Sequence, residues 1–282
     1  MEVRILDHKQ VLSFLPDRPQ SAHKGICGKI LLLCGSRGYT GAPALAAMGA
    51  LRAGSGLVFL AVPESIYEIE AVKLTEPVIQ PLPDHNGTYS ITAVRSILTM
   101  LEKKDAVLIG PGIGRSEGSL AVVLSVLKHF PGPVVLDADG INVLCEHKNI
   151  LRERTAPTII TPHNSEFQRI GGLLTDNRIQ SAKKLASDLG IIVLLKGPGT
   201  IITDGTLCYQ NPTGNPGMAT GGSGDVLAGI ITALLGFGIS PLHAAACGAW
   251  LHGAAGDICA QEIGQYGMLP SDMINVLPRL LK

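Results

Sequence analysis

Near its C-terminal end the chain contains the stretch Gly214-Asn215-Pro216-Gly217-Met218-Ala219-Thr220-Gly221-Gly222-Ser223-Gly224-Asp225. Six of these twelve residues are glycine or proline, so we expect a loop with free backbone amides up to Gly222. Residues 226–238 are almost wholly apolar and too few to span a membrane, which predicts a buried helix. The first turn of such a helix has unpaired N–H groups and a partial positive charge. The stretch therefore predicts a phosphate-binding site.

Asp225 places a carboxylate at this predicted phosphate site. An aspartate in the first turn of a helix is also favoured by the helix dipole alone, so a purely structural role stays open. In the functional interpretation, Asp225 faces a second substrate and takes the proton from a hydroxyl that attacks the phosphate. A carboxylate with a pKa of roughly 4 is a weak base. It is sufficient here because the proton leaves late in a loose phosphoryl-transfer transition state.

The composition limits the class of protein. The 282 residues are 46% hydrophobic with a mean hydropathy of +0.30, and the 34 glycines cluster after apolar runs, as in α/β proteins. The net charge is zero and there is no Lys/Arg run, which argues against a nucleic-acid partner. The six cysteines form no C-x-x-C pair, which argues against a zinc site and a disulfide framework and suits a reducing cytosol. With neither a signal peptide nor a membrane-spanning stretch in the sequence, we expect no membrane association and a cytoplasmic location.

Apolar strands and helical segments alternate along the chain, which predicts βαβ units and a parallel sheet. The predicted strands are 29–34, 57–62, 106–109, 134–136, 158–160 and 191–195, with a hairpin of 200–203 and 207–210. The predicted helices are 7–14, 42–53, 90–103, 119–129, 179–189, 242–259 and 271–280, in addition to 226–238. Polar and glycine residues follow the strand ends, and these ends share one edge of a parallel sheet. We therefore expect one crevice, in a single domain that comprises residues 1–282.

Several polar residues at strand ends allow two interpretations. Lys196 is either a surface lysine or part of a loop that grips a nucleotide with its backbone and one positive charge. His163 either caps a turn or donates hydrogen bonds to a ligand, and Glu166 either lies in the first turn of a helix or holds Mg²⁺ through water. We expect Asp137 and Asp139 to divide their roles, one as a polar contact and one at a helix start.

Two further features carry less information. His243 and His252 lie nine residues apart on an alanine-rich segment, which is not a metal-ligand spacing, so we expect packing or surface roles. The GxxxxGK[ST] motif is absent, which excludes a P-loop protein.

The segment GNPGMATGGSGDVLAGIITALLGFG (214–238) resembles the signature of the ribokinase-like superfamily, whose GxGD motif is here Gly222-Ser223-Gly224-Asp225. Five further segments narrow the resemblance. They are HKGICGKILLLCGSRGYTGAPALAAMGALRAGSGLV (23–58), GPGIGR (110–115), LDADGIN (136–142), TPHNSEF (161–167) and KGPGT (196–200). In this order they resemble the NAD(P)H-hydrate dehydratase family, which repairs hydrated nicotinamide cofactors.

The resemblance implies a ribokinase-like three-layer α/β/α sandwich with a mainly parallel central sheet. It implies a lyase that uses ADP or ATP to remove water from the (S)-hydrate of NADH or NADPH. By matching positions, the hydrate is expected to contact Ala42, Gly112, His163 and Asp225. The adenine nucleotide is expected to contact Lys196, Gly197, Pro198, Gly199, Thr200 and Gly224. A homotetramer is what the family suggests.

Three details refine this resemblance. Related small-molecule kinases have Thr-Pro-Asn-x-x-Glu where this chain has His163 in place of the asparagine, which favours the dehydratase branch. Cys34 departs from the family, which commonly has glycine there. Bifunctional relatives carry an extra epimerase domain, for which we expect no room in 282 residues.

Two other functions stay open at this stage. One is a vitamin or sugar kinase of the same fold, such as a hydroxyethylthiazole kinase, and the other is a nucleotide-sensing module without turnover. The sequence does not decide between ADP and ATP, between the two hydrates, or on a role for K⁺.

Overall fold

A computed structural model describes residues 3–281 of the chain. In this part of the chain the main sheet has ten strands, in the order β1-β12-β11-β10-β9-β8-β7-β2-β3-β4. These are β1 (Arg4–Ile5), β2 (Lys29–Leu33), β3 (Leu57–Pro63), β4 (Val78–Leu82), β7 (Ala106–Ile109), β8 (Val134–Leu136), β9 (Thr158–Ile160), β10 (Ile192–Leu195), β11 (Ile201–Thr203) and β12 (Cys208–Gln210). Only β11 runs antiparallel to its neighbours within the described sheet. Strands β5 (Asp84–His85) and β6 (Thr88–Tyr89) form a small separate hairpin.

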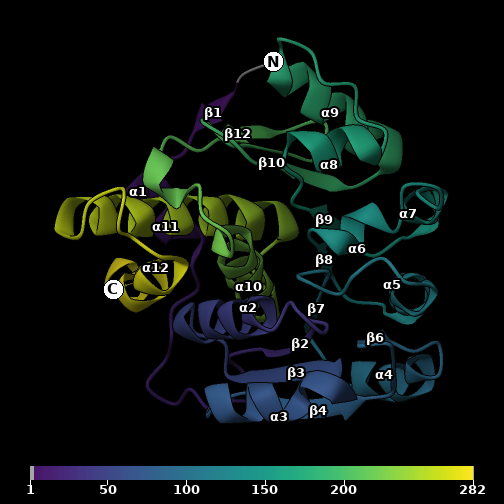
Figure 1. Cartoon of the computed structure of the whole chain (residues 1–282). Helices are drawn as coiled ribbons and strands as arrows, with labels where there is room; N and C mark the ends of the chain where they lie inside the picture. Colours follow the sequence, from purple (N-terminus) through teal and green to yellow (C-terminus); the bar gives the residue numbers. More distant parts are fainter. Residues whose placement is uncertain (1–2, 282) are drawn as a thin grey trace.

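Helices cover both faces of the sheet (Figure 1). They are α1 (His8–Phe14), α2 (Gly41–Arg52), α3 (Glu64–Lys73), α4 (Ala93–Leu101), α5 (Glu117–His129), α6 (Asp139–Asn142), α7 (Asn149–Glu153), α8 (Asn164–Arg169), α9 (Arg178–Leu189), α10 (Ser223–Gly236), α11 (Pro241–Glu262) and α12 (Pro270–Val276). One apolar cluster packs α1, α2, α3, α10 and α11 against the sheet, and a second packs α4, α5, α7, α8 and α9 against the opposite face.

The alternation of side chains along β2 explains these two clusters. Ile30 and Leu32 belong to the first cluster, whereas Leu31 and Leu33 belong to the second. All four side chains are fully buried, because successive residues of a strand point to opposite faces and both faces are covered. The continuous apolar run of this strand is therefore a direct consequence of the three-layer architecture.

Small residues allow α2 and α10 to pack closely. A Cβ atom on Gly229 would lie 2.1 Å from the carbonyl oxygen of Ala46, and one on Gly49 would lie 2.8 Å from that of Val226. No side chain fits at either position without moving backbone, so the two glycines fix the approach of the two helices. This packing holds the N-terminus of α10 at the sheet edge where the parallel strands end (Figure 1).

The predicted elements are present, with differences at their ends, and the structure contains further elements that were not predicted. The helix predicted at 90–103 is shorter (α4), and that predicted at 271–280 ends at Val276 and continues as a 3₁₀ turn around Pro278. The sequence interpretation missed α3 and β4, and also the short elements β1, β5, β6 and α7. Strand β4 lies at the sheet edge, is partly exposed and contains Pro81, so it lacks the continuous apolar pattern of a central strand.

Two findings concern the cysteines and the length of the helices. All six cysteines are free thiols. Within residues 3–281, no helix has both the length and the apolar character needed to cross a membrane.

Candidate functional site

The glycine-rich stretch forms the predicted loop and helix start. Gly222 has a φ angle of +97°, a left-handed conformation that suits glycine, and α10 begins at the next residue. The loop before it includes one short 3₁₀ turn, Pro216–Met218, which the sequence interpretation did not foresee. Asp257 of α11 fixes the loop, since its carboxylate accepts hydrogen bonds from the backbone N–H of Gly214 (2.9 Å) and the side-chain amide of Asn215 (3.0 Å).

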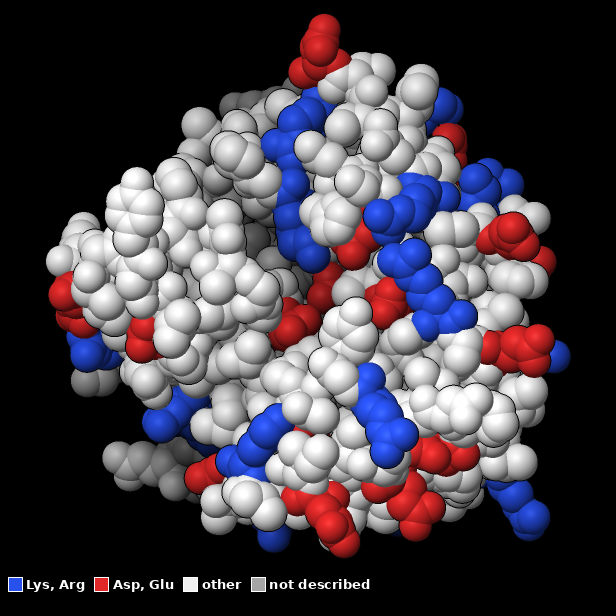
Figure 2. All heavy atoms as spheres, viewed as in Figure 1, with Lys and Arg blue, Asp and Glu red and all other residues white. Residues whose placement is uncertain are grey.

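A cavity of about 890 Å³ lies between this loop, α10, α11 and the segment after β10. Figure 2 shows a hollow near the centre of this face, with acidic side chains at its floor and basic side chains along its rim. All six residues predicted to contact the nucleotide line the cavity, namely Lys196, Gly197, Pro198, Gly199, Thr200 and Gly224. The volume is typical of a site for a small organic ligand. Direct contact of these residues with a nucleotide stays a prediction.

Lys196 forms an ion pair in front of the α10 N-terminus. Its Nζ atom lies 2.9 Å from Oδ1 of Asp137 and 3.9 Å from Oε2 of Glu166. Burial lowers the pKa of Lys196, but the carboxylates of Asp137 and Glu166 outweigh burial and raise it above its ordinary value. A Cβ atom on Gly224 would lie 3.3 Å from this Nζ atom. The ammonium group therefore stands beside the free amides of the helix start.

Asp137 and Asp139 divide their roles as predicted. Asp137 is buried and accepts a hydrogen bond of 2.6 Å from the hydroxyl of Thr161 in addition to the one from Lys196. Asp139 is the first residue of α6 and binds the side chain of Arg115 at 2.9 Å. Asp137 therefore lies beside the start of α10, since its Oδ2 would be 3.8 Å from a Cβ atom on Gly224, whereas Asp139 pairs with Arg115.

The carboxyl group of Asp225 differs from the ordinary acid that the sequence interpretation assumed. Burial, and next the negative charge of Asp137, raise its pKa to about 7, although the nearby Lys196 acts in the opposite direction. No ion pair of Asp225 is present among the described residues. At neutral pH the group is thus divided between its acid and base forms.

Ala42 and Gly112 lie side by side but outside the cavity. A Cβ atom on Gly112 would lie 3.2 Å from that of Ala42, and Gly112 has a φ angle of +67°. The residues that line the cavity include His163 but not Ala42, Gly112 or Asp225. Of the four residues predicted to contact the hydrate, His163 therefore lies on the cavity wall, Ala42 and Asp225 lie in the first turns of α2 and α10, and Gly112 lies in the loop after β7.

His163 and Glu166 form the cap of α8. Nδ1 of His163 accepts a hydrogen bond from the N–H of Ser165 at 3.1 Å, and Oε2 of Glu166 accepts one from the N–H of His163 at 2.9 Å. The capping role considered for His163 and the first-turn position considered for Glu166 are thus present. The ligand role of His163 and the metal role of Glu166 stay predictions. Among residues 3–281, no group of three His, Cys, Asp or Glu side chains is arranged to hold a metal ion.

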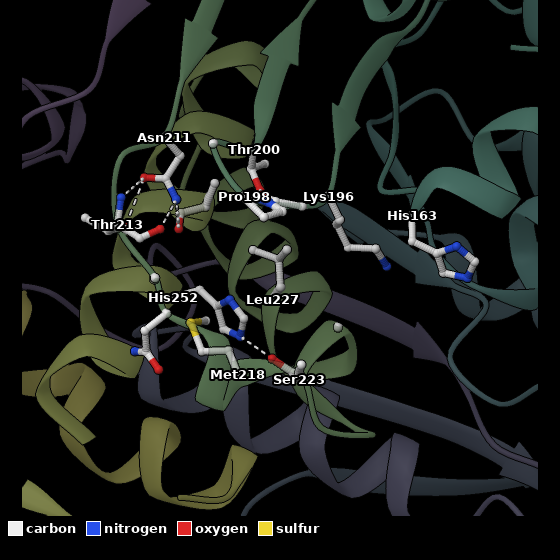
Figure 3. A pocket seen from close by; sticks show the side chains of 18 of the residues that line it. His163, Lys196, Pro198, Thr200, Asn211, Thr213, Met218, Ser223, Leu227 and His252 are labelled. Atoms are coloured by element: carbon white, nitrogen blue, oxygen red, sulfur yellow. Dashed lines mark hydrogen bonds between the residues drawn. The ribbon is translucent and has the colours of Figure 1, made fainter. Parts of the chain in front are cut away.

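The sequence interpretation missed one wall of the cavity. His252, expected to have a packing or surface role, lines it and is buried, with Nε2 3.3 Å from Oγ of Ser223 (Figure 3). Burial lowers the pKa of His252 to about 4. Asn211 and Thr213 lie across the cavity from Lys196 (Figure 3). They follow β12, whose end lies at the same sheet edge. The expectation that binding residues follow strand ends could therefore have identified them.

His243 has the packing role expected for it. Its ring stacks on Phe14 at a centroid distance of 3.9 Å, and its Nε2 lies 3.2 Å from the hydroxyl of Tyr209. It does not line the cavity.

Comparison with known proteins agrees with this geometry. The family model described as NAD(P)H-hydrate dehydratase matches residues 30–279. A bifunctional NAD(P)H-hydrate repair enzyme of Moorella thermoacetica is 43% identical over 286 residues, which covers 99% of this chain and 54% of the relative. The chain thus spans about half the length of the curated relatives it matches.

Solved structures show the same fold. The crystal structure of the ADP/ATP-dependent NAD(P)H-hydrate dehydratase from Bacillus subtilis, co-crystallised with ATP/Mg²⁺, has a TM-score of 0.87 and 32% identity, covering 99% of this chain and 98% of that one. A ribokinase-like superfamily protein from Enterococcus faecalis has a TM-score of 0.87 and 26% identity, covering 99% and 95%. The expected ribokinase-like three-layer fold is confirmed. The chain belongs to the NAD(P)H-hydrate dehydratase family.

Proposed function

We propose that this chain is a lyase that dehydrates the (S)-hydrate of NADH or NADPH and restores the reduced cofactor, driven by ADP or ATP. Membership of the dehydratase family supports this function over a vitamin or sugar kinase of the same fold. One observation carries the proposal. Asp225, with a pKa raised to about 7, directly follows Gly224, which lines a cavity of nucleotide size at the start of α10.

The first step is phosphorylation of the hydrate hydroxyl. Hydroxide is a poor leaving group, so the hydroxyl oxygen first attacks the terminal phosphorus of the nucleotide while Asp225 accepts its proton. A base works best when its pKa lies near the working pH, so the raised pKa suits Asp225 to this role. The Lys196 ammonium and the free amides at the start of α10 stabilise the charge on the transferred group.

The second step is elimination of phosphate. The lone pair of the ring nitrogen expels the phosphate, which leaves with the electrons of the C–O bond. Loss of a proton from the adjacent ring carbon restores the double bond. The products are the intact reduced cofactor, inorganic phosphate, and AMP from ADP or ADP from ATP.

Magnesium is expected to enter with the nucleotide. Glu166 already accepts the N–H of His163, and Asp137 is paired with Lys196, so these carboxylates suit contact through metal-bound water better than a direct cage. When bound, Mg²⁺ would neutralise charge on the phosphates, and we assign Glu166 to one of its water ligands.

Assembly and location belong to the same proposal. Residues 1–282 act as one domain, which the single large sheet of the described residues supports. A homotetramer is supported by the exposed apolar side chains of Ile263, Tyr266 and Leu269, and a cytoplasmic location by the free thiols.

The test is an assay with the hydrate of NADH or NADPH, run in parallel with ADP and ATP. Recovery of reduced-nicotinamide absorbance together with release of inorganic phosphate supports the dehydratase. A stable phosphorylated product without recovery supports a kinase. Nucleotide binding without phosphate release from any substrate supports a sensing module.

A further inference from the structure

In the loop after β10, most carbonyl groups accept hydrogen bonds from the protein, whereas most amide groups donate none to the described residues. Arg178 donates to the carbonyl oxygens of Lys196 (2.8 Å) and Pro198 (3.0 Å). The carbonyl of Gly197 accepts from the hydroxyl of Thr200 at 2.9 Å, and that of Thr200 accepts from the N–H of Asn211 at 2.9 Å. The carbonyl groups of this loop are therefore largely occupied within the protein.

The N–H of Lys196 donates to the carbonyl of Pro162 at 2.9 Å, but the other amide groups of the same loop are not occupied by described residues. Among the hydrogen bonds of residues 3–281, none is donated by the N–H of Gly197, Gly199 or Thr200, and Pro198 has no N–H. All of these residues line the cavity. Gly197 is exposed and Gly199 and Thr200 are half-buried, so these amides can bind water in the open cavity. A ligand with acceptor atoms can replace that water and accept the same hydrogen bonds.

Arg178 contacts the loop from outside the cavity. It is the first residue of α9 and does not line the cavity. A Cβ atom on Gly197 would lie 2.8 Å from its Nη2 atom, so the guanidinium lies directly against the loop backbone. A planar guanidinium has several donors in a fixed geometry, which lets one side chain hold two carbonyls of a tight loop at once.

We propose that Arg178 is a positioning residue for nucleotide binding. It holds the carbonyls of Lys196 and Pro198 toward α9 and so leaves the amides of Gly197, Gly199 and Thr200 free to donate to acceptor atoms of the adenine nucleotide. This inference rests on the proposed function, because it takes the ligand of the cavity to be an adenine nucleotide. It assigns to Arg178 no contact with the ligand and no part in the chemistry.

Arg154 offers a matched control. Its guanidinium likewise donates to two backbone carbonyls, those of Leu127 and Gly132, and is also partly buried. Arg154 directly follows α7, and the two carbonyls that it binds lie at the end of α5 and just before β8, at the opposite edge of the sheet. It does not line the cavity. Replacing either arginine removes the same kind of contact, but only Arg178 holds the loop.

The experiment is calorimetric titration of ADP and ATP into the wild-type chain and into the Arg178→Ala, Arg178→Lys and Arg154→Ala variants, without the hydrate. We expect Arg178→Ala to raise Kd by roughly tenfold or more, Arg178→Lys to recover part of the loss, and Arg154→Ala to leave Kd within about twofold. In hydrate turnover, we expect the KM for nucleotide to rise in Arg178→Ala with a much smaller change in kcat.

The outcomes separate the two proposals. An unchanged Kd in folded Arg178→Ala, or an equal rise in Arg154→Ala, overturns the role of Arg178 and leaves the dehydratase function intact. If Arg178→Ala does not fold, an unchanged Kd in Arg178→Lys overturns it equally. The proposed function alone is contradicted if nucleotide binding depends on Arg178 but the wild-type chain dehydrates neither hydrate. Both proposals are overturned if the wild-type chain binds neither ADP nor ATP.

Discussion

The Nζ atom of Lys196 and Oδ1 of Asp137 are 2.9 Å apart, and this pair lies against the backbone of Gly224 at the start of α10. The two charges act on Asp225 in opposite directions, since Asp137 raises its pKa and Lys196 lowers it. Burial is the larger effect and, with Asp137, brings the pKa of this carboxyl to about 7. The pair thus affects the pKa of a carboxyl group with which neither member forms an ion pair in the described residues.

The first prediction concerns pH. Asp225 must be ionised to accept a proton, so kcat/KM for the hydrate should rise as the pH passes through about 7 and level off above it. Replacing Asp137 by Asn removes a negative charge that raises this pKa, so the midpoint should move to lower pH. Steady-state rates from about pH 5.5 to about pH 9 provide the measurement. A midpoint that Asp137→Asn leaves unchanged contradicts the coupling.

The second prediction concerns the base itself. Replacing Asp225 by Asn should lower kcat by roughly 10²- to 10⁴-fold, because the amide cannot accept the hydroxyl proton. Nucleotide affinity should change little, which titration with ADP checks. Asp188→Asn is the control, because that carboxylate is exposed and pairs with Lys184 on the surface of α9. An Asp225→Asn enzyme with wild-type turnover would remove Asp225 from this role.

The third prediction uses two glycines of the glycine-rich stretch, Gly221 in the loop and Gly224 in the first turn of α10. A methyl group on Gly224 would lie 3.3 Å from Nζ of Lys196 and intrude on the predicted phosphate position, so Gly224→Ala should raise the KM for nucleotide roughly tenfold. A methyl group on Gly221 meets no atom within 4 Å, so Gly221→Ala should have little effect. Equal effects of the two substitutions would indicate a general sensitivity of the loop.

The fourth prediction concerns backbone strain at the site. Ala138 has φ and ψ angles of 48° and −116°, a combination that disfavours residues with a Cβ atom. Ala138→Gly should therefore raise the free energy of unfolding by about 1 kcal/mol, after the entropic cost of the glycine is deducted. Ala121→Gly, in the middle of α5, should lower it by about 1 kcal/mol. Urea denaturation of both variants measures the difference in sign.

The fifth prediction links His252 to stability. Its pKa is lowered from 6.5 to about 4 in the folded chain, so folding favours the neutral ring. The corresponding stability is complete above pH 6.5 and is lost as the pH falls toward 4, a change of about 3 kcal/mol. His252→Gln should flatten the pH dependence of urea denaturation over this range. The exposed His147, replaced in the same way, should leave it as in the wild type.

The sequence predicted the central strands well because both of their faces are covered. A strand such as β2 needs apolar residues at every position, and that pattern is visible without a structure. The edge region was harder to predict. Helix α3 carries charged residues along much of its length, and β4 is partly exposed, so neither has a strong apolar pattern.

The site was predictable in position but not in electrostatics. Strand ends and glycine loops located the cavity-lining residues Lys196 and Gly224. The pairing of Lys196 with Asp137, 59 residues away in the sequence, depends on which strands are neighbours in the sheet. The raised pKa of Asp225 and the burial of His252 depend on packing, which no local pattern records.

Cys34 follows β2 in the region where these charges meet, and its side chain has no exposed surface. Burial and the negative charges of Asp225 and Asp137 keep its pKa well above the ordinary thiol value, so in the folded chain it is both shielded and unreactive. An alkylating reagent can reach this sulfur only during transient local opening. The chain therefore carries a native reporter, and the labelling rate of this one thiol, followed by mass spectrometry, measures how often the structure around the end of β2 opens.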